Sequence, residues 1–197
     1  MDFVFVCVLS YLVGSIPNGL ILGKLVWHTD LREHGSHNIG ATNAWRTLGK
    51  GPGFLVFFLD LLKGVIGVWF GMNISGLPLA MVLGGIFAIV GHSWSFLLGF
   101  KGGKGVATGL GVIAMLMTQA TVIVFAVWLV IVYSTKYVSL ASIAAAALVP
   151  ILAWLFAYPT EYFYFGIIAA FFVIYRHKTN IDRLLHGTES RIKAGHY

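Results

Sequence analysis

Six long apolar runs constrain this chain more than any other feature of its sequence. They cover residues 2–22, 51–72, 77–98, 106–133, 138–158 and 162–175. A helix needs about 20 apolar residues to cross a bilayer, and about 17 is a short limit. Only 10% of the residues are charged, against roughly 25% in soluble domains. Because backbone groups within a bilayer must be satisfied inside each segment, and the runs do not alternate as barrel strands do, we predict an all-α integral membrane protein.

The first run is typical of a retained helix. It has neither a basic beginning nor a small-residue cleavage pattern, so it does not match a signal peptide. Cys7, the single cysteine of the chain, excludes an intrachain disulfide and is expected to serve in packing. The net charge of +6 is explained by basic loops beside anionic lipid and does not require nucleic acid as a partner.

Positive charges predict the orientation of the helices. Lys and Arg residues gather in the 27–50 loop, the 99–105 loop and the tail from residue 176, whereas the connections 72–76 and 157–161 contain none. The positive-inside rule places the three basic segments in the cytoplasm and the N-terminus outside.

Six simple helices would leave the tail on the same side as the N-terminus, so a seventh crossing is needed. The 105–134 run spans about 30 residues, or about 45 Å of helix against a hydrocarbon core of about 30 Å. Its most polar break is at 117–119. We therefore predict a bundle of seven transmembrane helices in one domain, residues 1–197, with the fourth and fifth helices short. One long tilted helix is the alternative.

The first cytoplasmic loop is rich in groups that can hold a phosphate. Ser36, Asn38, Thr42 and Asn43 offer hydroxyl and amide donors, and Arg46 adds a planar cationic fork. The alternative is an ordinary turn-rich loop in which these residues cap helices.

The second basic loop, residues 99–105, is called the glycine loop below. Gly102, Gly103 and Gly105 let the backbone approach a ligand, and Lys101 and Lys104 supply charge at the start of the next helix. The loop does not match a nucleotide-binding P-loop, because the glycine and hydroxyl positions of that motif differ. A flexible basic turn at the lipid surface is the alternative.

The remaining polar candidates lie in the tail and within the apolar runs. His177 and Asn180 share a face if the tail is helical. Asp60 and Lys63 are intramembrane charges that can pair, and His92 lies late in the third run. Each of these, like Ser139 and Ser142 at the start of the 138–158 run, can serve chemistry or structure.

Taken in order along nearly the whole chain, these segments resemble the multi-spanning glycerol-3-phosphate acyltransferases that use acyl phosphate as donor. The matching segments are Gly14-Ser15-Ile16-Pro17, Gly35-Ser36, Gly40-Ala41-Thr42-Asn43, Asp60-Leu61-Leu62-Lys63-Gly64, Gly91-His92, residues 100–108, residues 137–142, Arg176-His177, Asn180-Ile181 and Arg183-Leu184. The resemblance implies seven helices. It also implies transfer of a long-chain acyl group to the 1-hydroxyl of glycerol 3-phosphate, with no nucleotide, metal or coenzyme and with membrane lipid as the surroundings.

The resemblance also implies roles for individual residues. It places Ser36 and Arg46 in a first catalytic motif, the glycines 102, 103 and 105 with Lys104 in a glycerol 3-phosphate loop, and His177 and Asn180 in a third motif. Combined with the residue chemistry, the predicted catalytic residues are Ser36, Arg46, Lys104, His177 and Asn180. The predicted substrate-binding residues are Asn38, Thr42, Asn43, Lys101, Gly102, Gly103, Gly105 and Ser142. Asp60, Lys63, His92 and Glu189 are expected to be structural or of open role, and no metal ligands are predicted.

The sequence departs from the family pattern at two places, and it leaves one rival function. His37 stands where glycine is usual, and Trp94-Ser95 stands where an aromatic–proline pair is common. The proton acceptor is either His177 or the phosphate of the donor. The rival function is a phosphate transporter or channel, which would favour internal repeats and a site near the midplane. Neither feature is evident in this sequence.

Overall fold

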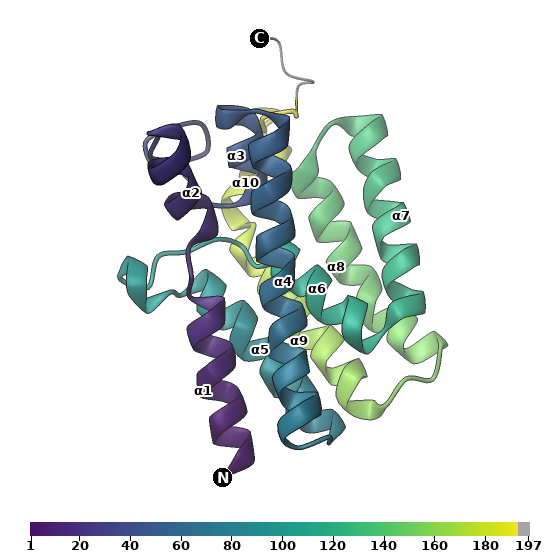
Figure 1. Cartoon of the computed structure of the whole chain (residues 1–197). Helices are drawn as coiled ribbons and strands as arrows, with labels where there is room; N and C mark the ends of the chain where they lie inside the picture. Colours follow the sequence, from purple (N-terminus) through teal and green to yellow (C-terminus); the bar gives the residue numbers. More distant parts are fainter. Residues whose placement is uncertain (193–197) are drawn as a thin grey trace. The chain divides into compact units, whose positions relative to one another are not determined.

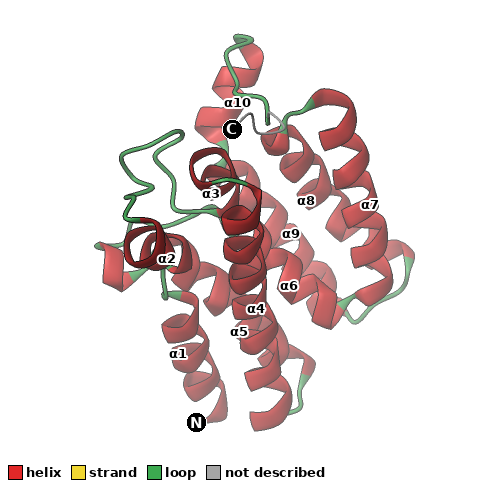
Figure 2. Cartoon of the chain, turned by 45° about the horizontal axis from the view of Figure 1, so that its top comes forward, coloured by secondary structure: helices red, strands yellow, loops and turns green. Residues whose placement is uncertain are grey.

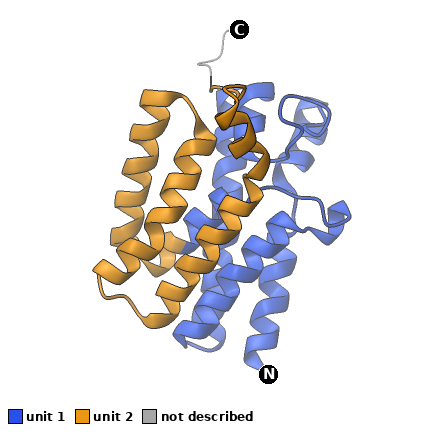
Figure 3. Ribbon diagram, turned by 180° about the vertical axis from the view of Figure 1, so that it is seen from behind, with its two compact units in different colours: residues 1–112, 194–197 blue, residues 113–193 orange. Residues whose placement is uncertain are grey.

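The computed structural model describes residues 1–192, and within them it contains helices and loops but no strand (Figure 2). The chain divides into two compact units, residues 1–112 and residues 113–192 of the described part (Figure 3). Each unit is described by itself.

The first unit is built on three long helices that lie side by side (Figure 1). Helix α1 packs against α4 and α5, and α4 packs against α5 and the short α3. The helices of this unit are α1 Asp2–Gly14, α2 Asn18–Trp27, α3 Ala41–Leu48, α4 Lys50–Ile74, α5 Pro78–Ser93, the 3₁₀ turn η1 Phe96–Leu98 and the first part of α6 Val106–Leu116.

The first apolar run, expected to be one helix, is broken after Gly14. Pro17 has no backbone N–H and restricts the residue before it, so the helical ladder stops and α2 restarts at Asn18. The residues at the break contact the segment after α5. There the Ser95 hydroxyl donates a hydrogen bond to the Ser15 carbonyl at 2.6 Å. Helix α2 therefore begins with a polar residue, Asn18, although the sequence before and after it is mostly apolar.

Close approach of α4 and α5 depends on glycine. A β-carbon at Gly67 would lie 2.5 Å from the Gly84 carbonyl oxygen, and one at Gly84 would overlap the Gly67 carbonyl. The Ser10 hydroxyl of α1 donates to the Gly67 carbonyl at 3.4 Å. In lipid, where water provides no hydrophobic drive between helices, such backbone contact is what holds helices together.

The second unit contains α7 Thr118–Thr135, α8 Val138–Leu155, α9 Thr160–Arg176 and α10 Lys178–Leu185. Helix α8 lies between α7 and α9, and α10 contacts α8 and α9. The predicted break near Thr118 is confirmed, because α6 ends at Leu116 and α7 begins at Thr118. Helix α6 has 11 residues and is short, as expected, and α7 has 18, which is close to the short limit for a crossing.

Five helical segments of the described residues are long and apolar enough to cross a bilayer: Asp2–Trp27, Lys50–Ile74, Pro78–Leu98, Thr118–Thr135 and Val138–Leu155. Helix α9 has 17 residues, at the short limit for a crossing. Helix α6 has 11 residues, which span only about 16 Å. The seven-helix count and the orientation of the ends therefore stay predictions.

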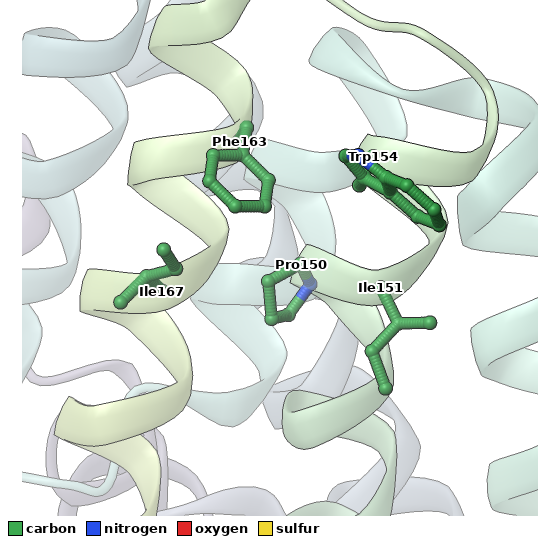
Figure 4. A pocket seen from close by; sticks show the side chains of 5 residues that line it. All are labelled: Pro150, Ile151, Trp154, Phe163 and Ile167. Atoms are coloured by element: carbon green, nitrogen blue, oxygen red, sulfur yellow. The ribbon is translucent and has the colours of Figure 1, made fainter.

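An open apolar hollow of about 390 Å³ lies on α8 and α9. Its lining comes from Pro150, Ile151, Trp154, Phe163 and Ile167 (Figure 4). These side chains offer no cation and no row of amide donors, so the hollow is not suited to binding a phosphate. The candidate chemistry lies elsewhere in each unit.

Candidate functional site

Asn43, at the start of α3, organises the 27–50 loop from inside. Its side chain is 1% exposed. Its Oδ1 accepts the Ser36 backbone N–H at 2.8 Å, and its Nδ2 donates to the carbonyls of Leu31, His34 and Asn38 at 2.8–3.0 Å. Its donors are therefore already used within the loop. Binding of substrate by Asn43 stays a prediction, and it would require Asn43 to give up one of these bonds.

The other predicted residues of this loop lie around Asn43. Ser36 is exposed and its backbone is fixed by Asn43. The Asn38 Oδ1 accepts the Gly40 N–H at 2.9 Å, which supports the turn into α3. Thr42 and Arg46 are both half-buried and lie four residues apart on α3, so they share one face. A buried cluster of Leu31, Ala44 and Val56 fixes α3 on α4.

His37, the departure from the family pattern, has φ +55°. This is the left-handed region, which glycine adopts without strain, so the backbone explains why glycine is usual here. The ring is exposed, and its Nδ1 donates to the Arg32 carbonyl at 2.9 Å. Histidine is thus tolerated because it compensates the strain with a local hydrogen bond.

Substitution at residue 37 should follow this backbone requirement. We expect His37→Gly to change the free energy of unfolding by less than about 1 kcal/mol, because relief of strain offsets one exposed hydrogen bond. His37→Val should lower it by about 1–2 kcal/mol, because a β-branched residue is disfavoured there. Thermal unfolding of both variants in detergent checks this. Equal stability of the two variants would contradict it.

The glycine loop is packed directly onto the end of α5. The Gly103 N–H donates to the His92 carbonyl at 3.1 Å. A β-carbon at Gly102 would overlap that carbonyl, and one at Gly103 would overlap Nε2 of the His92 ring. The loop turns through left-handed backbone at Gly99, Phe100 and Gly105. Glycine is therefore required at 102 and 103 by space and suits 99 and 105 by conformation.

Lys104 lies in the glycine loop, and α6 begins two residues after it. Lys104 is half-buried, whereas Lys101 is exposed. Thr108, in the first turn of α6, is fully buried, and its hydroxyl has no hydrogen-bond partner among the described residues. The backbone N–H groups of a first helical turn have no partner in the helix and favour anions. Loop, lysine and helix start together form an arrangement suited to a phosphate.

Ser95, the second departure, is also accommodated. Its φ is −67°, a value that proline adopts too, and its hydroxyl makes the bond to Ser15 described above. Serine therefore keeps the loop's entry in the expected backbone conformation and adds a contact between the end of α1 and the segment after α5.

Near the glycine loop, polar side chains of α2, α4 and α5 form a connected series of contacts. Lys63 Nζ is 2.9 Å from Asp60 Oδ1, and their side chains are only 4% and 2% exposed. Asn18 Nδ2 donates to the same oxygen at 3.1 Å. Lys63 Nζ also lies 3.5 Å from His92 Nδ1. The pairing of Asp60 with Lys63 was expected from their spacing, but Asn18 and the contact to His92 were not, because they join distant segments.

In the second unit, Glu189 is the centre of a buried cluster. Its Oε1 accepts from Ser139 and from Asn180, both at 2.8 Å, and its Oε2 accepts from Arg183 Nε at 2.7 Å. The carboxylate thus joins the start of α8 to α10. This arrangement agrees with a structural role for Glu189. Burial would raise the pKa of Glu189, but the hydrogen bonds from Asn180, Arg183 and Ser139 outweigh it and lower that pKa.

The lowered pKa predicts a loss of stability in acid. The ionised Glu189 stabilises the fold above the carboxyl's ordinary pKa, and this contribution is lost as the pH falls through the lower folded pKa. We expect wild-type protein to lose more thermal stability between about pH 5 and pH 3 than Glu189→Gln does. Asp30, whose pKa Arg32 holds well below its usual range, is unchanged in both proteins. Parallel pH profiles would contradict the prediction.

His177 and Ser142 lie in the same unit. His177, 3% exposed, follows the last residue of α9, and its Nδ1 is 2.7 Å from the Val173 carbonyl. Because a carbonyl only accepts, Nδ1 carries the hydrogen, and in the neutral ring the lone pair is on Nε2. The Ser142 hydroxyl donates to the Val138 carbonyl at 2.8 Å and accepts from Trp128 Nε1 at 3.2 Å.

Comparisons with known proteins agree with the motifs. The family model for glycerol-3-phosphate acyltransferase matches residues 4–187. A glycerol-3-phosphate acyltransferase of Fusobacterium nucleatum is 45% identical and covers 98% of this chain and 100% of its own. One from Desulforudis audaxviator is 47% identical, over 93% of this chain and 92% of its own.

Two crystal structures are also similar. Both are of PlsY (YgiH), an integral membrane glycerol 3-phosphate acyltransferase. The glycerol 3-phosphate form has a TM-score of 0.93 at 41% identity and covers 98% of this chain and 96% of its own. The lysophosphatidic acid form has a TM-score of 0.91 at 39% identity, over 98% and 97%. The resemblance identified from the motifs is confirmed.

Proposed function

This chain belongs to the glycerol-3-phosphate acyltransferase family, and from that premise we propose that it transfers a long-chain acyl group from acyl phosphate to the 1-hydroxyl of glycerol 3-phosphate. The observation that supports this most is the glycine loop with its Lys104, packed on His92 and followed by the start of α6. It brings a half-buried cation and a helix start to one place. A phosphate-bearing acceptor requires such donors.

The reaction needs little covalent help from the protein. The 1-hydroxyl oxygen attacks the acyl carbonyl carbon, the bond from that carbon to the phosphate oxygen breaks, and inorganic phosphate leaves with both electrons of that bond. The hydroxyl proton passes to a base, and lysophosphatidic acid is formed. Acyl phosphate is already activated, so positioning and neutralisation of the phosphates supply most of the catalysis.

In the first unit, Arg46, Lys104 and the N–H groups in the first turn of α6 are assigned contacts to phosphate. Ser36, whose backbone is fixed by Asn43, is assigned a hydrogen bond to substrate. Lys101 and Thr42 are assigned supporting contacts; Lys101, being exposed, contributes less than Lys104. These assignments rest on charge, burial and loop geometry.

In the second unit, His177 is proposed as the proton acceptor. Its Nδ1–H bond to Val173 leaves Nε2 as the basic nitrogen of the neutral ring, as general-base catalysis requires. Asn180 is held by Glu189, which orients its amide for substrate. The donor phosphate as base is the alternative, and a folded His177→Gln variant tests it: kcat should fall about 10²–10⁴-fold if His177 is the base, whereas a kcat near that of wild type rejects His177 as the base.

The setting is proposed to be the bacterial inner membrane. Five apolar spans among the described residues and the family together support a multi-pass membrane protein. Lysine and arginine gather in three segments: the 27–50 loop, the glycine loop and the tail. Under the positive-inside rule this distribution supports a site on the cytoplasmic side. Phospholipid synthesis is the proposed use of the product, and no obligate protein partner is proposed.

The donor is tested by comparing two activated acyl groups. Purified protein in detergent is given palmitoyl phosphate or palmitoyl-coenzyme A, each with and without glycerol 3-phosphate, and phosphate, thiol and lysophosphatidic acid are measured. We expect phosphate and lysophosphatidic acid in equal amounts, only from palmitoyl phosphate and only with the acceptor. Acyl transfer from palmitoyl-coenzyme A alone would reject acyl phosphate as donor, and no transfer from a folded preparation would reject the reaction.

A further inference from the structure

The buried polar chain in the first unit ends at the glycine loop. Beginning at Asn18 of α2, it passes through Asp60 and Lys63 of α4 and reaches His92 of α5. His92 then contacts residue 103 twice: its carbonyl accepts a hydrogen bond from the Gly103 N–H, and its ring lies against Gly103. A charged pair in an apolar segment is costly. Its contact with a histidine that touches this loop points to a function beyond pairing.

The contact with Lys63 favours one position for the hydrogen of the His92 ring. The Lys63 ammonium has only donors, and it lies 3.5 Å from Nδ1. A lone pair on Nδ1 is therefore favoured, since a hydrogen there would point at a cation. Donation from Nδ1 to Asp60 Oδ1 would compete, but those atoms are 3.7 Å apart, too far for a hydrogen bond. The neutral ring thus carries its hydrogen on Nε2, the nitrogen that faces Gly103.

We propose that His92 is a positioning residue for the acceptor substrate. Asp60 and Lys63 hold its ring in the form with hydrogen on Nε2, and His92 in turn fixes the backbone at Gly102 and Gly103. That backbone positions Lys104 and the start of α6 for the phosphate of glycerol 3-phosphate. The inference rests on the proposed function, because it assumes that the loop binds this substrate.

Two substitutions at residue 92 separate positioning from packing. Gln places its amide N–H near the position of Nε2, whereas Asn does not reach it, and both are neutral and polar. We expect His92→Asn to raise KM for glycerol 3-phosphate about tenfold, because the shorter side chain no longer reaches residue 103 to hold the loop. KM for palmitoyl phosphate and kcat should change less than about twofold. His92→Gln should recover most of the loss.

A third variant tests the role of the ion pair. Asp60→Asn with Lys63→Met removes both charges together, so no buried charge is left unpaired. Methionine does not donate to Nδ1, so the ring is no longer held in one form. We expect this double variant to fold and to raise KM for glycerol 3-phosphate as His92→Asn does. An unchanged KM in a folded double variant would overturn the role of the pair.

The hydrogen on Nε2 is measured without any assay of function. Nitrogen-15 NMR of histidine-labelled protein, with His92→Gln used to assign the signal, distinguishes a hydrogen on Nε2 from one on Nδ1. A signal for Nδ1–H at His92 overturns the proposal, as does an equal rise of both KM values in His92→Asn. If wild-type protein shows the Nε2–H signal and binds radiolabelled glycerol 3-phosphate but transfers no acyl group, the proposed function fails and the positioning role is supported by binding alone.

Discussion

Replacing Lys104 by methionine is expected to lower kcat/KM for glycerol 3-phosphate by about 10²–10³-fold, the usual cost of removing one preorganised charge or donor. Lys104 is half-buried near the end of the glycine loop, two residues before α6 begins, so the protein shields it in part from water. A cation in such surroundings interacts more strongly with a phosphate dianion than it would in bulk water. Methionine keeps the length and flexibility of the side chain, so the loss reports the charge.

The matched control is Lys50→Met in the same unit. Lys50 is exposed at the first residue of α4 and has no assigned role in the reaction, so the activity of this variant should stay within about twofold of wild type. Initial rates of phosphate release over a range of glycerol 3-phosphate concentrations give both values. A similar loss in the two variants would mean that general surface charge, rather than a site at Lys104, attracts the substrate.

Some features of this structure could be read from the sequence because they depend on local rules. The most polar break, at residues 117–119, divides a run that is too long for one crossing. In the structure one helix ends and the next begins there. The glycines around Lys104 predicted that the backbone approaches a ligand, and this stays a prediction; in the structure the backbone at Gly102 and Gly103 approaches His92. The spacing of Asp60 and Lys63 predicted an ion pair, which is present at 2.9 Å.

Other features depend on contacts between distant segments and could not be read in this way. The first apolar run contains a proline, yet its long hydrophobic pattern favoured one continuous helix. Asn43 looked like a ligand for substrate because it lies among hydroxyl and amide groups, but in the structure its own loop occupies its donors. Asn18 and His92 are far from Asp60 in sequence, so no spacing rule indicates that they meet it.

Replacing Lys63 by methionine should lower the free energy of unfolding by about 3–5 kcal/mol, because it leaves the Asp60 carboxylate buried without its cation. Lys24→Met is the matched control. It also removes a lysine from a 2.9 Å pair with an aspartate, but the Lys24 side chain is 50% exposed whereas that of Lys63 is 4% exposed. An exposed pair is worth about 0–1 kcal/mol, and Asp30 keeps Arg32 as a cation at 2.7 Å, so Lys24→Met should change the free energy of unfolding little.

Thermal unfolding in detergent, followed by circular dichroism, measures the difference. The loss in Lys63→Met corresponds to a fall in melting temperature on the order of 10 °C, and adding Asp60→Asn should recover most of it, because no unpaired charge then remains in the apolar interior. The asparagine side chain introduced by Asp60→Asn keeps an oxygen that can accept from Asn18. If the second substitution recovers nothing, the lysine stabilises the fold through packing of its stem rather than through its charge; if Lys24→Met is equally unstable, burial is not the deciding factor.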